Sequence, residues 1–172
     1  MRYLSLILLL ACSDKSASTD SGDTGDANTS PDESVEGFGD LQLAFAMDAD
    51  YLELLRDTYG EKAIGTFYGS VYRTEDVTSI GPVDGAEPLA SADVETVDLT
   101  PSGDETAVLH TIEGLPSGSV TILGFLDTDG NAKSDDPGPD DHDPVTLPSE
   151  NAFEVVADTE SLAVVYFGFL NP

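Results

Sequence analysis

Apolar residues in this 172-residue chain come in short alternating runs, and the aromatic residues are confined to one part of it. Of its seven Phe and six Tyr, all but Tyr3 lie beyond residue 37. In residues 41–47 large apolar side chains alternate with small or polar ones, a period of two that predicts a half-buried strand. Similar runs predict seven strands in all, over residues 41–47, 64–73, 94–99, 106–112, 119–126, 152–157 and 161–170. The last run is apolar on both faces, so we expect a central strand there.

One helix interrupts the predicted strands. Helical spacing of apolar side chains is found at Tyr51, Leu52, Leu54, Leu55 and Tyr59. Asp50 and Glu53 stand where a capping box would start the helix, and Gly60 where it would stop. Turn signals separate the strands about every 8–12 residues, and strands do not alternate with helices. The sequence therefore predicts a mainly β fold, an antiparallel seven-stranded Ig-like sandwich with one short helix.

The first twelve residues are typical of an export signal. Arg2 precedes an apolar run over residues 4–10, which is shorter than the ~20 residues that a membrane-spanning helix needs. The only cysteine follows at once, and Leu9-Leu10-Ala11-Cys12 resembles the lipobox of bacterial lipoproteins. The resemblance implies lipid attachment to the Cys12 thiol, cleavage before Cys12 and acylation of the new amino terminus, which together anchor a protein stably. The alternative is an ordinary secretory peptide with an incidental cysteine.

The residues after Cys12 predict the location and the layout of the chain. Ser13 stands where an Asp would mark inner-membrane retention, so analogy with such lipoproteins favours the outer membrane of a Gram-negative bacterium. Residues 13–36 contain no aromatic residue, Leu or Ile and cannot offset the entropy cost of ordering. We therefore expect a signal peptide (1–11), a lipidated Cys12 with a disordered acidic linker (12–36) and a β-sandwich domain (37–172).

Two of the predicted strands are joined by a Gly-Leu-Pro-x-Gly motif at Gly114, Leu115, Pro116, Ser117 and Gly118. From Thr106 to the C-terminus the chain resembles prealbumin-like sandwich modules, which include carboxypeptidase-regulatory-like and Cna-B-like domains. The resemblance implies a sandwich whose open end is plugged by Leu115. It also implies a non-catalytic role as a stalk, spacer or partner-binding unit. Ser119 departs from the Tyr or Thr that the family normally has there.

Residues 127–143, here called the acidic loop, contain seven aspartates. Carboxylate and amide oxygens are the ligands that Ca²⁺ prefers. The predicted Ca²⁺ ligands are Asp127, Asp129, Asn131, Asp135 and Asp136. The loop is not an EF-hand, because Gly130 and Gly138 do not fit that spacing. It is more similar to the Asp-rich calcium loops of some Cna-B-like modules. The alternative is a solvated loop in an Asp-rich protein.

Charge and missing motifs exclude several functions. With 34 acidic and 6 basic residues the net charge is −28, which excludes nucleic-acid binding through a basic face. No nucleophile elbow, zinc-protease motif or phosphate loop occurs. His110 falls within a predicted strand and is interpreted as structural or surface-exposed, and His142 lies among aspartates. We therefore expect no enzyme; a hydrolase would need one of these histidines beside a Ser or Asp nucleophile.

Two functions fit these observations. The first is a non-catalytic lipoprotein of the cell envelope, held by its lipid, whose β domain serves structure or binds a protein or cation partner. The second is an envelope lipoprotein that binds a small ligand in an apolar pocket between the sheets or at the loop end, lined by tyrosines such as Tyr68 and Tyr72. The acidity itself fits attraction to cations or basic partners, or an adaptation to high salt.

Overall fold

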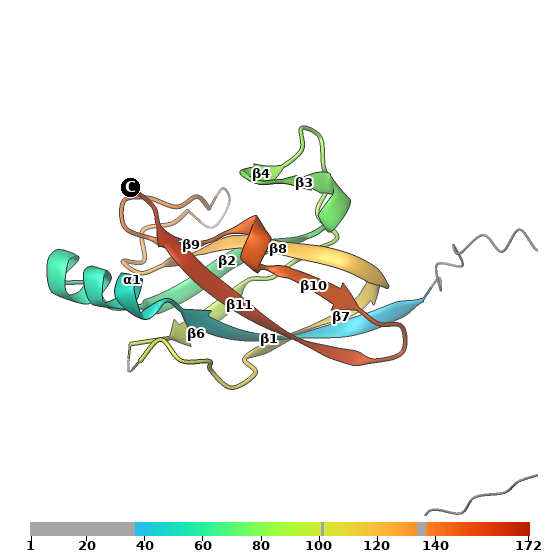
Figure 1. The fold of residues 1–172 in the computed structure, drawn as a ribbon, viewed down its shortest axis with the longest axis horizontal. Coiled ribbons are helices and arrows are strands. Elements are labelled where there is room, and N and C mark those ends of the chain that lie inside the picture. Colours follow the sequence, from blue (N-terminus) through green and yellow to red (C-terminus); the bar gives the residue numbers. More distant parts are fainter. Residues whose placement is uncertain (1–36, 101, 134–136) are drawn as a thin grey trace, which may run out of the picture. The chain divides into compact units, whose positions relative to one another are not determined.

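A computed structural model describes residues 37–100, 102–133 and 137–172 (Figure 1). The predicted signal peptide (1–11), the lipidation residue Cys12 and the predicted linker (12–36) lie outside the described residues. The described part is mainly β with one short helix, as the sequence predicts. It holds no helix that is long and apolar enough to cross a lipid bilayer.

The strands follow the predicted runs closely, and short extra strands lie between them. Their bounds are β1 Phe38–Met47, β2 Ile64–Arg73, β3 Val77–Thr78, β4 Gly81–Pro82, β5 Ala90–Ser91, β6 Val94–Asp98, β7 His110–Pro116, β8 Gly118–Asp127, β9 Pro144–Thr146, β10 Ala152–Val155 and β11 Glu160–Leu170. The run predicted over residues 106–112 is displaced, because β7 begins only at His110 and continues through Pro116.

One mixed sheet contains all of these strands except β3 and β4, which form a separate ribbon. Its order is β5-β2-β8-β9-β11-β1-β7, with β10 paired to β8 and β6 paired to β2. β11 therefore lies between two partners, which confirms it as a central strand. β1 and β11 run parallel, from Asp40 opposite Glu160 to Met47 opposite Phe167, whereas the other pairs are antiparallel. The predicted antiparallel seven-stranded sandwich is thus not confirmed, since periodicity shows a strand's faces but not its partner's direction.

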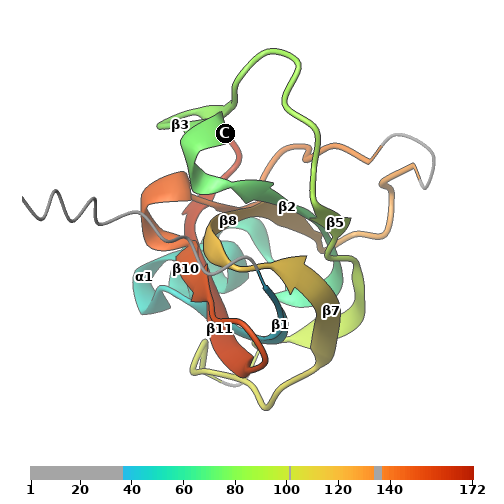
Figure 2. The ribbon, with the colours of Figure 1, turned by 90° about the vertical axis from the view of Figure 1, so that its right-hand side faces the viewer.

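The sheet curls until it is nearly closed around its core. Phe45 of β1, Phe67 of β2 and Phe167 of β11 are fully buried, although β2 stands far from β1 and β11 in the strand order. Their ring centroids lie 5.0 Å (Phe45–Phe67), 5.8 Å (Phe67–Phe167) and 6.2 Å (Phe45–Phe167) apart. Figure 2 shows β2 and β8 above β1 and β11 in this arrangement. Burial of each such ring stabilises the fold by roughly 1.5–3 kcal/mol.

The helix lies between β1 and β2, as predicted. α1 spans Ala49–Leu54 and continues as a π-helical turn over Leu55–Tyr59, which ends at Gly60. Its cap is Asp48 rather than the predicted Asp50, because the Asp48 carboxylate accepts the backbone N–H of Asp50 (2.8 Å).

The Gly-Leu-Pro-x-Gly motif joins two distant parts of the sheet. Leu115 is 2% exposed and belongs to the core. β7 pairs with β1, whereas β8 pairs with β2, so the motif carries the chain from one part of the sheet to the other. Gly118, where β8 begins, has a φ of 119°, a conformation that favours glycine.

Candidate functional site

The first residues of the acidic loop fold back onto the carboxylate of Asp127, the last residue of β8. The backbone N–H groups of Gly130 (2.8 Å) and Asn131 (3.2 Å) donate to its Oδ1, and that of Ala132 (3.3 Å) donates to its Oδ2. The side chain is only 4% exposed. Buried polar groups are stable in proteins when they are hydrogen-bonded, and this carboxylate satisfies three amides of its own loop.

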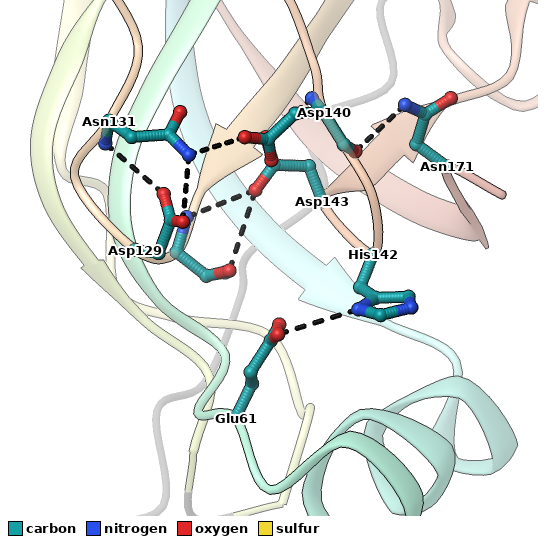
Figure 3. A network of polar contacts seen from close by, with 8 residues as sticks. Glu61, Asp129, Asn131, Asp140, His142, Asp143 and Asn171 are labelled. Carbon is teal, nitrogen blue, oxygen red and sulfur yellow. Dashed lines mark hydrogen bonds and ion pairs between the residues drawn. The ribbon is translucent and has the colours of Figure 1, made fainter.

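A second buried carboxylate closes the loop from its other end. Asp143 is 2% exposed and accepts the backbone N–H (3.2 Å) and the hydroxyl (3.4 Å) of Thr128 and the backbone N–H of Asp140 (3.2 Å) (Figure 3). Burial raises the pKa of Asp143 to about 6, against the opposing effect of the two backbone hydrogen bonds. The charges of Asp140 and Asp127 raise this pKa further.

The other predicted calcium ligands that the structure describes do not share the burial of Asp127. Asp129 accepts the backbone N–H (3.1 Å) and the side-chain amide (2.8 Å) of Asn131, and the same amide donates to Asp140. Asp135 and Asp136 lie outside the described residues. Among the residues that are described, no three Asp, Glu, His or Cys side chains converge as a metal site would require. Calcium binding by this loop therefore stays a prediction.

The two histidines occupy unrelated places. His142 in the acidic loop stacks on Tyr59, with ring centroids 3.6 Å apart and an interplanar angle of 13°. Its Nδ1 lies 3.4 Å from Glu61 Oε1, and its backbone N–H donates to the carbonyl of Asn171 (2.8 Å). His142 thus connects the loop to the helix end and to the C-terminus, a role that its sequence neighbours do not reveal. His110 is exposed at the start of the edge strand β7.

A groove lies on the outer face of β2 and β8. Cross-strand pairs form its floor: Tyr68 is opposite Phe125, and Ser70 is opposite Leu123. The groove has a volume of about 550 Å³. Its lining residues are Tyr68, Gly69, Ser70, Tyr72, Pro82, Ser91, Asp93, Leu123, Gly124, Phe125, Pro137 and Pro139. Pro82 comes from β4 of the separate ribbon, and Pro137 and Pro139 come from the acidic loop. Tyr68 and Tyr72 therefore line one hollow, but it lies on the outer face of β2 and β8 and not between two sheets as expected from the sequence.

The floor of this groove rests on a close contact inside the sheet. Gly69 and Gly124 face each other across β2 and β8, and the Phe67 ring packs against both from the core side. A Cβ at Gly124 would lie 2.4 Å from the carbonyl oxygen of Tyr68 and 2.7 Å from the Phe67 ring. Only glycine fits such an approach, so the core ring supports the floor without filling the outer face.

The described lining of the groove combines aromatic rings with a carboxylate. The rings of Tyr68 and Phe125 lie 5.6 Å apart between centroids, at 31°. Among the described residues of the lining, Asp93 is the charged one, and its Oδ1 accepts the backbone N–H of Gly69 (3.2 Å). A second hollow of about 240 Å³ continues the groove past Pro82 and Phe125 to Ile80, which is 95% exposed. Sequence periodicity places Tyr68 and Tyr72 on one face, but Asp93 and the prolines carry no signal that would bring them there.

Comparisons with known proteins found no relative of this chain. No family model, no curated protein and no solved structure matches the chain. The function has therefore to be argued from the residues of the groove and the acidic loop themselves.

Proposed function

We propose that this chain is a lipid-anchored, non-catalytic binding module of the cell envelope, which receives a ligand in the groove on β2 and β8. The observation that carries the proposal is the groove itself, with two tyrosines and Phe125 of one sheet face gathered in a hollow of about 550 Å³. Hollows of roughly 300–1,000 Å³ lined by aromatic side chains and a few polar groups are typical of ligand sites.

The anchor in this proposal rests on the sequence alone. Leu9-Leu10-Ala11-Cys12 resembles a lipobox, and Ser13 favours the outer membrane. The fold family is likewise proposed: the buried Leu115 and the motif from Gly114 to Gly118 support a prealbumin-like module, whose members are mostly non-catalytic.

The anchor is tested by the intact mass of the membrane-extracted full chain. We expect the wild type to lack residues 1–11 and to carry acyl chains on the new amino terminus and the Cys12 thiol. Cys12→Ala should lose both changes and leave the membrane fraction, whereas the neighbouring Ser13→Ala should keep them. An unaltered mass and location in Cys12→Ala would overturn the anchor.

The groove is tested by binding of three defined probes to the full chain in detergent: a basic peptide, a neutral peptide of equal length and a neutral oligosaccharide. We expect at least one probe to bind, and Tyr68→Ala to weaken it by about tenfold, because an aromatic contact surface is lost. Tyr68→Phe should bind as the wild type does. The matched control is Phe38→Ala, an aromatic residue that is 66% exposed and does not line the groove.

We propose Ca²⁺ binding at the acidic loop as a second function, with Asp127, Asp129, Asn131, Asp135 and Asp136 as ligands. It is favoured by the crowding of carboxylates, since Asp127 and Asp140 both raise the pKa of Asp143 and a cation would relieve that repulsion. Millimolar Ca²⁺ should then raise the melting temperature by mass action on the folded state, more than an equal ionic strength of NaCl does. Asp129→Asn should reduce this shift, and Asp104→Asn, which lies outside the acidic loop, should not. Superimposable melting curves in Ca²⁺ and in chelator would exclude calcium binding.

A further inference from the structure

The groove carries a charge that an uncharged ligand would not use. Asp93 is exposed at the edge of β2, where it sits beside Tyr68 because it holds the backbone N–H of the next residue, Gly69. A carboxylate has about four acceptor positions, and Gly69 uses one of them. Tyr68 adds an aromatic face within the same lining. A carboxylate beside an aromatic ring is the pairing that recognises an ammonium or guanidinium group, through a charge-assisted hydrogen bond and a cation–π contact.

The length of the groove suits an extended ligand. Tyr68 and Tyr72 stand four residues apart on the same face of β2, which separates them by about 13 Å along the strand. The second hollow, with Ile80 and Pro148 in its lining, continues the groove beyond Pro82. A single small cation would reach one tyrosine only, whereas an extended peptide, at about 3.3 Å per residue, reaches both with four or five residues.

The charge of the whole chain selects among extended ligands. A net charge of −28 attracts cations over several ångströms, repels anions and offers nothing to a neutral glycan. The described part of the lining holds a carboxylate and no Lys or Arg, so the field of the whole chain and the local site favour the same ligand. Such agreement increases both the association rate and the specificity.

We propose that the groove binds an extended basic segment of a partner protein, with a Lys or Arg side chain placed between Asp93 and Tyr68. This inference rests on the proposed function of the groove and gives it a ligand class. Apolar residues of the segment then contact Tyr72, Leu123 and Pro82 along the floor and the wall.

The test uses fluorescence anisotropy of three labelled peptides of equal length, whose alternate positions carry Arg, Gln or Glu, and the neutral oligosaccharide as a fourth probe. We expect the full chain in detergent to bind the Arg peptide more tightly than the Gln peptide and to reject the Glu peptide. Higher NaCl should narrow the difference between Arg and Gln peptides, because screening weakens the charge contribution.

Asp93→Asn separates the local site from the field of the whole protein. The Asn Oδ1 still accepts the Gly69 N–H, so the backbone stays in place while one charge is lost. We expect about fivefold weaker binding of the Arg peptide and unchanged binding of the Gln peptide. Asp104→Asn removes the same charge from an exposed residue outside the lining and should change the Arg peptide's affinity by less than twofold.

The outcomes distinguish the two proposals. If Asp93→Asn and Asp104→Asn change the affinity for the Arg peptide equally, the proposal of a basic ligand is overturned. The groove is still a binding site in that case, provided that Tyr68→Ala weakens the binding of a probe. Binding of the oligosaccharide alone, with the same dependence on Tyr68, would also overturn the basic ligand and retain the groove. Equal effects of Tyr68→Ala and Phe38→Ala on every probe would overturn the groove itself. An unchanged far-UV circular dichroism spectrum of Tyr68→Ala excludes misfolding as the cause, and retained binding by Tyr68→Phe shows that the aromatic ring makes the contact.

Discussion

In the acidic loop, buried carboxylates face the loop's own backbone amides, whereas in the groove aromatic rings face away from the protein's core. Asp127 and Asp143 together hold N–H groups of five residues. Tyr68 and Tyr72 instead lie over a floor that the Phe67 ring already supports from inside. Side chains whose hydrogen bonds go to backbone amides of their own loop stabilise the conformation of that loop, whereas apolar side chains on a concave surface are available to a ligand. The density of aspartate along a sequence is therefore a poor guide to which aspartates bind something.

A large difference is expected when an aspartate is replaced by alanine in each of the two regions. Asp127→Ala should lower the free energy of unfolding by about 3–4 kcal/mol, because three backbone amides of the loop lose a buried, charged acceptor. Asp93→Ala, which removes one hydrogen bond of an exposed side chain, should lower it by less than about 1 kcal/mol. Urea unfolding with an unchanged m-value measures both. Equal losses would show that the loop carboxylate is not structural.

A smaller effect is expected from pH, through Asp143. Its folded pKa of about 6 lies above the ordinary value of 3.8, so folding favours the protonated form. This contribution is complete below about pH 4 and is lost as the pH rises through 6, by about 1.4 kcal/mol for each pKa unit. The wild type should therefore lose between about 2 and 3 kcal/mol relative to Asp143→Asn over that range.

The matched control for this pH effect is Asp141→Asn, at an exposed neighbouring position of the loop. It should keep the wild-type pH dependence, because the Asp141 side chain is exposed whereas that of Asp143 is buried. Parallel stability curves of the wild type and Asp143→Asn from pH 4 to 7 would contradict a raised pKa at this carboxyl.

Periodicity was sufficient to predict most of the strands but not their partners. Alternation along β1 and β2 distinguishes buried Phe45 and Phe67 from the outer face, and the same period places Tyr68 and Tyr72 together. The parallel pairing of β1 with β11 could not be predicted, because it joins residues more than a hundred positions apart and leaves no local signal.

The candidate site, like the fold, could be predicted from the sequence only in part. The sequence shows where aspartates are dense, but only the folded loop shows that Asp127 and Asp143 turn inward while Asp129 stays exposed. Likewise, Asp93 reaches the groove because β5 and β6 pair with β2 on either side of Gly69, and that depends on tertiary register.

The smallest expected effect tests whether the groove's side chains are dispensable for folding. Tyr68→Ala should lower the free energy of unfolding by about 1 kcal/mol, the usual contribution of a cross-strand aromatic pair such as Tyr68–Phe125. Phe67→Ala, one position earlier on the inner face, should cost about 3–5 kcal/mol, because it opens a cavity among Phe45, Phe167 and the glycines of the floor. Thermal or urea unfolding of the two variants gives the comparison directly. A loss of 3 kcal/mol or more in Tyr68→Ala would mean that the outer face also stabilises the fold, and its tyrosines would then need no ligand to explain them.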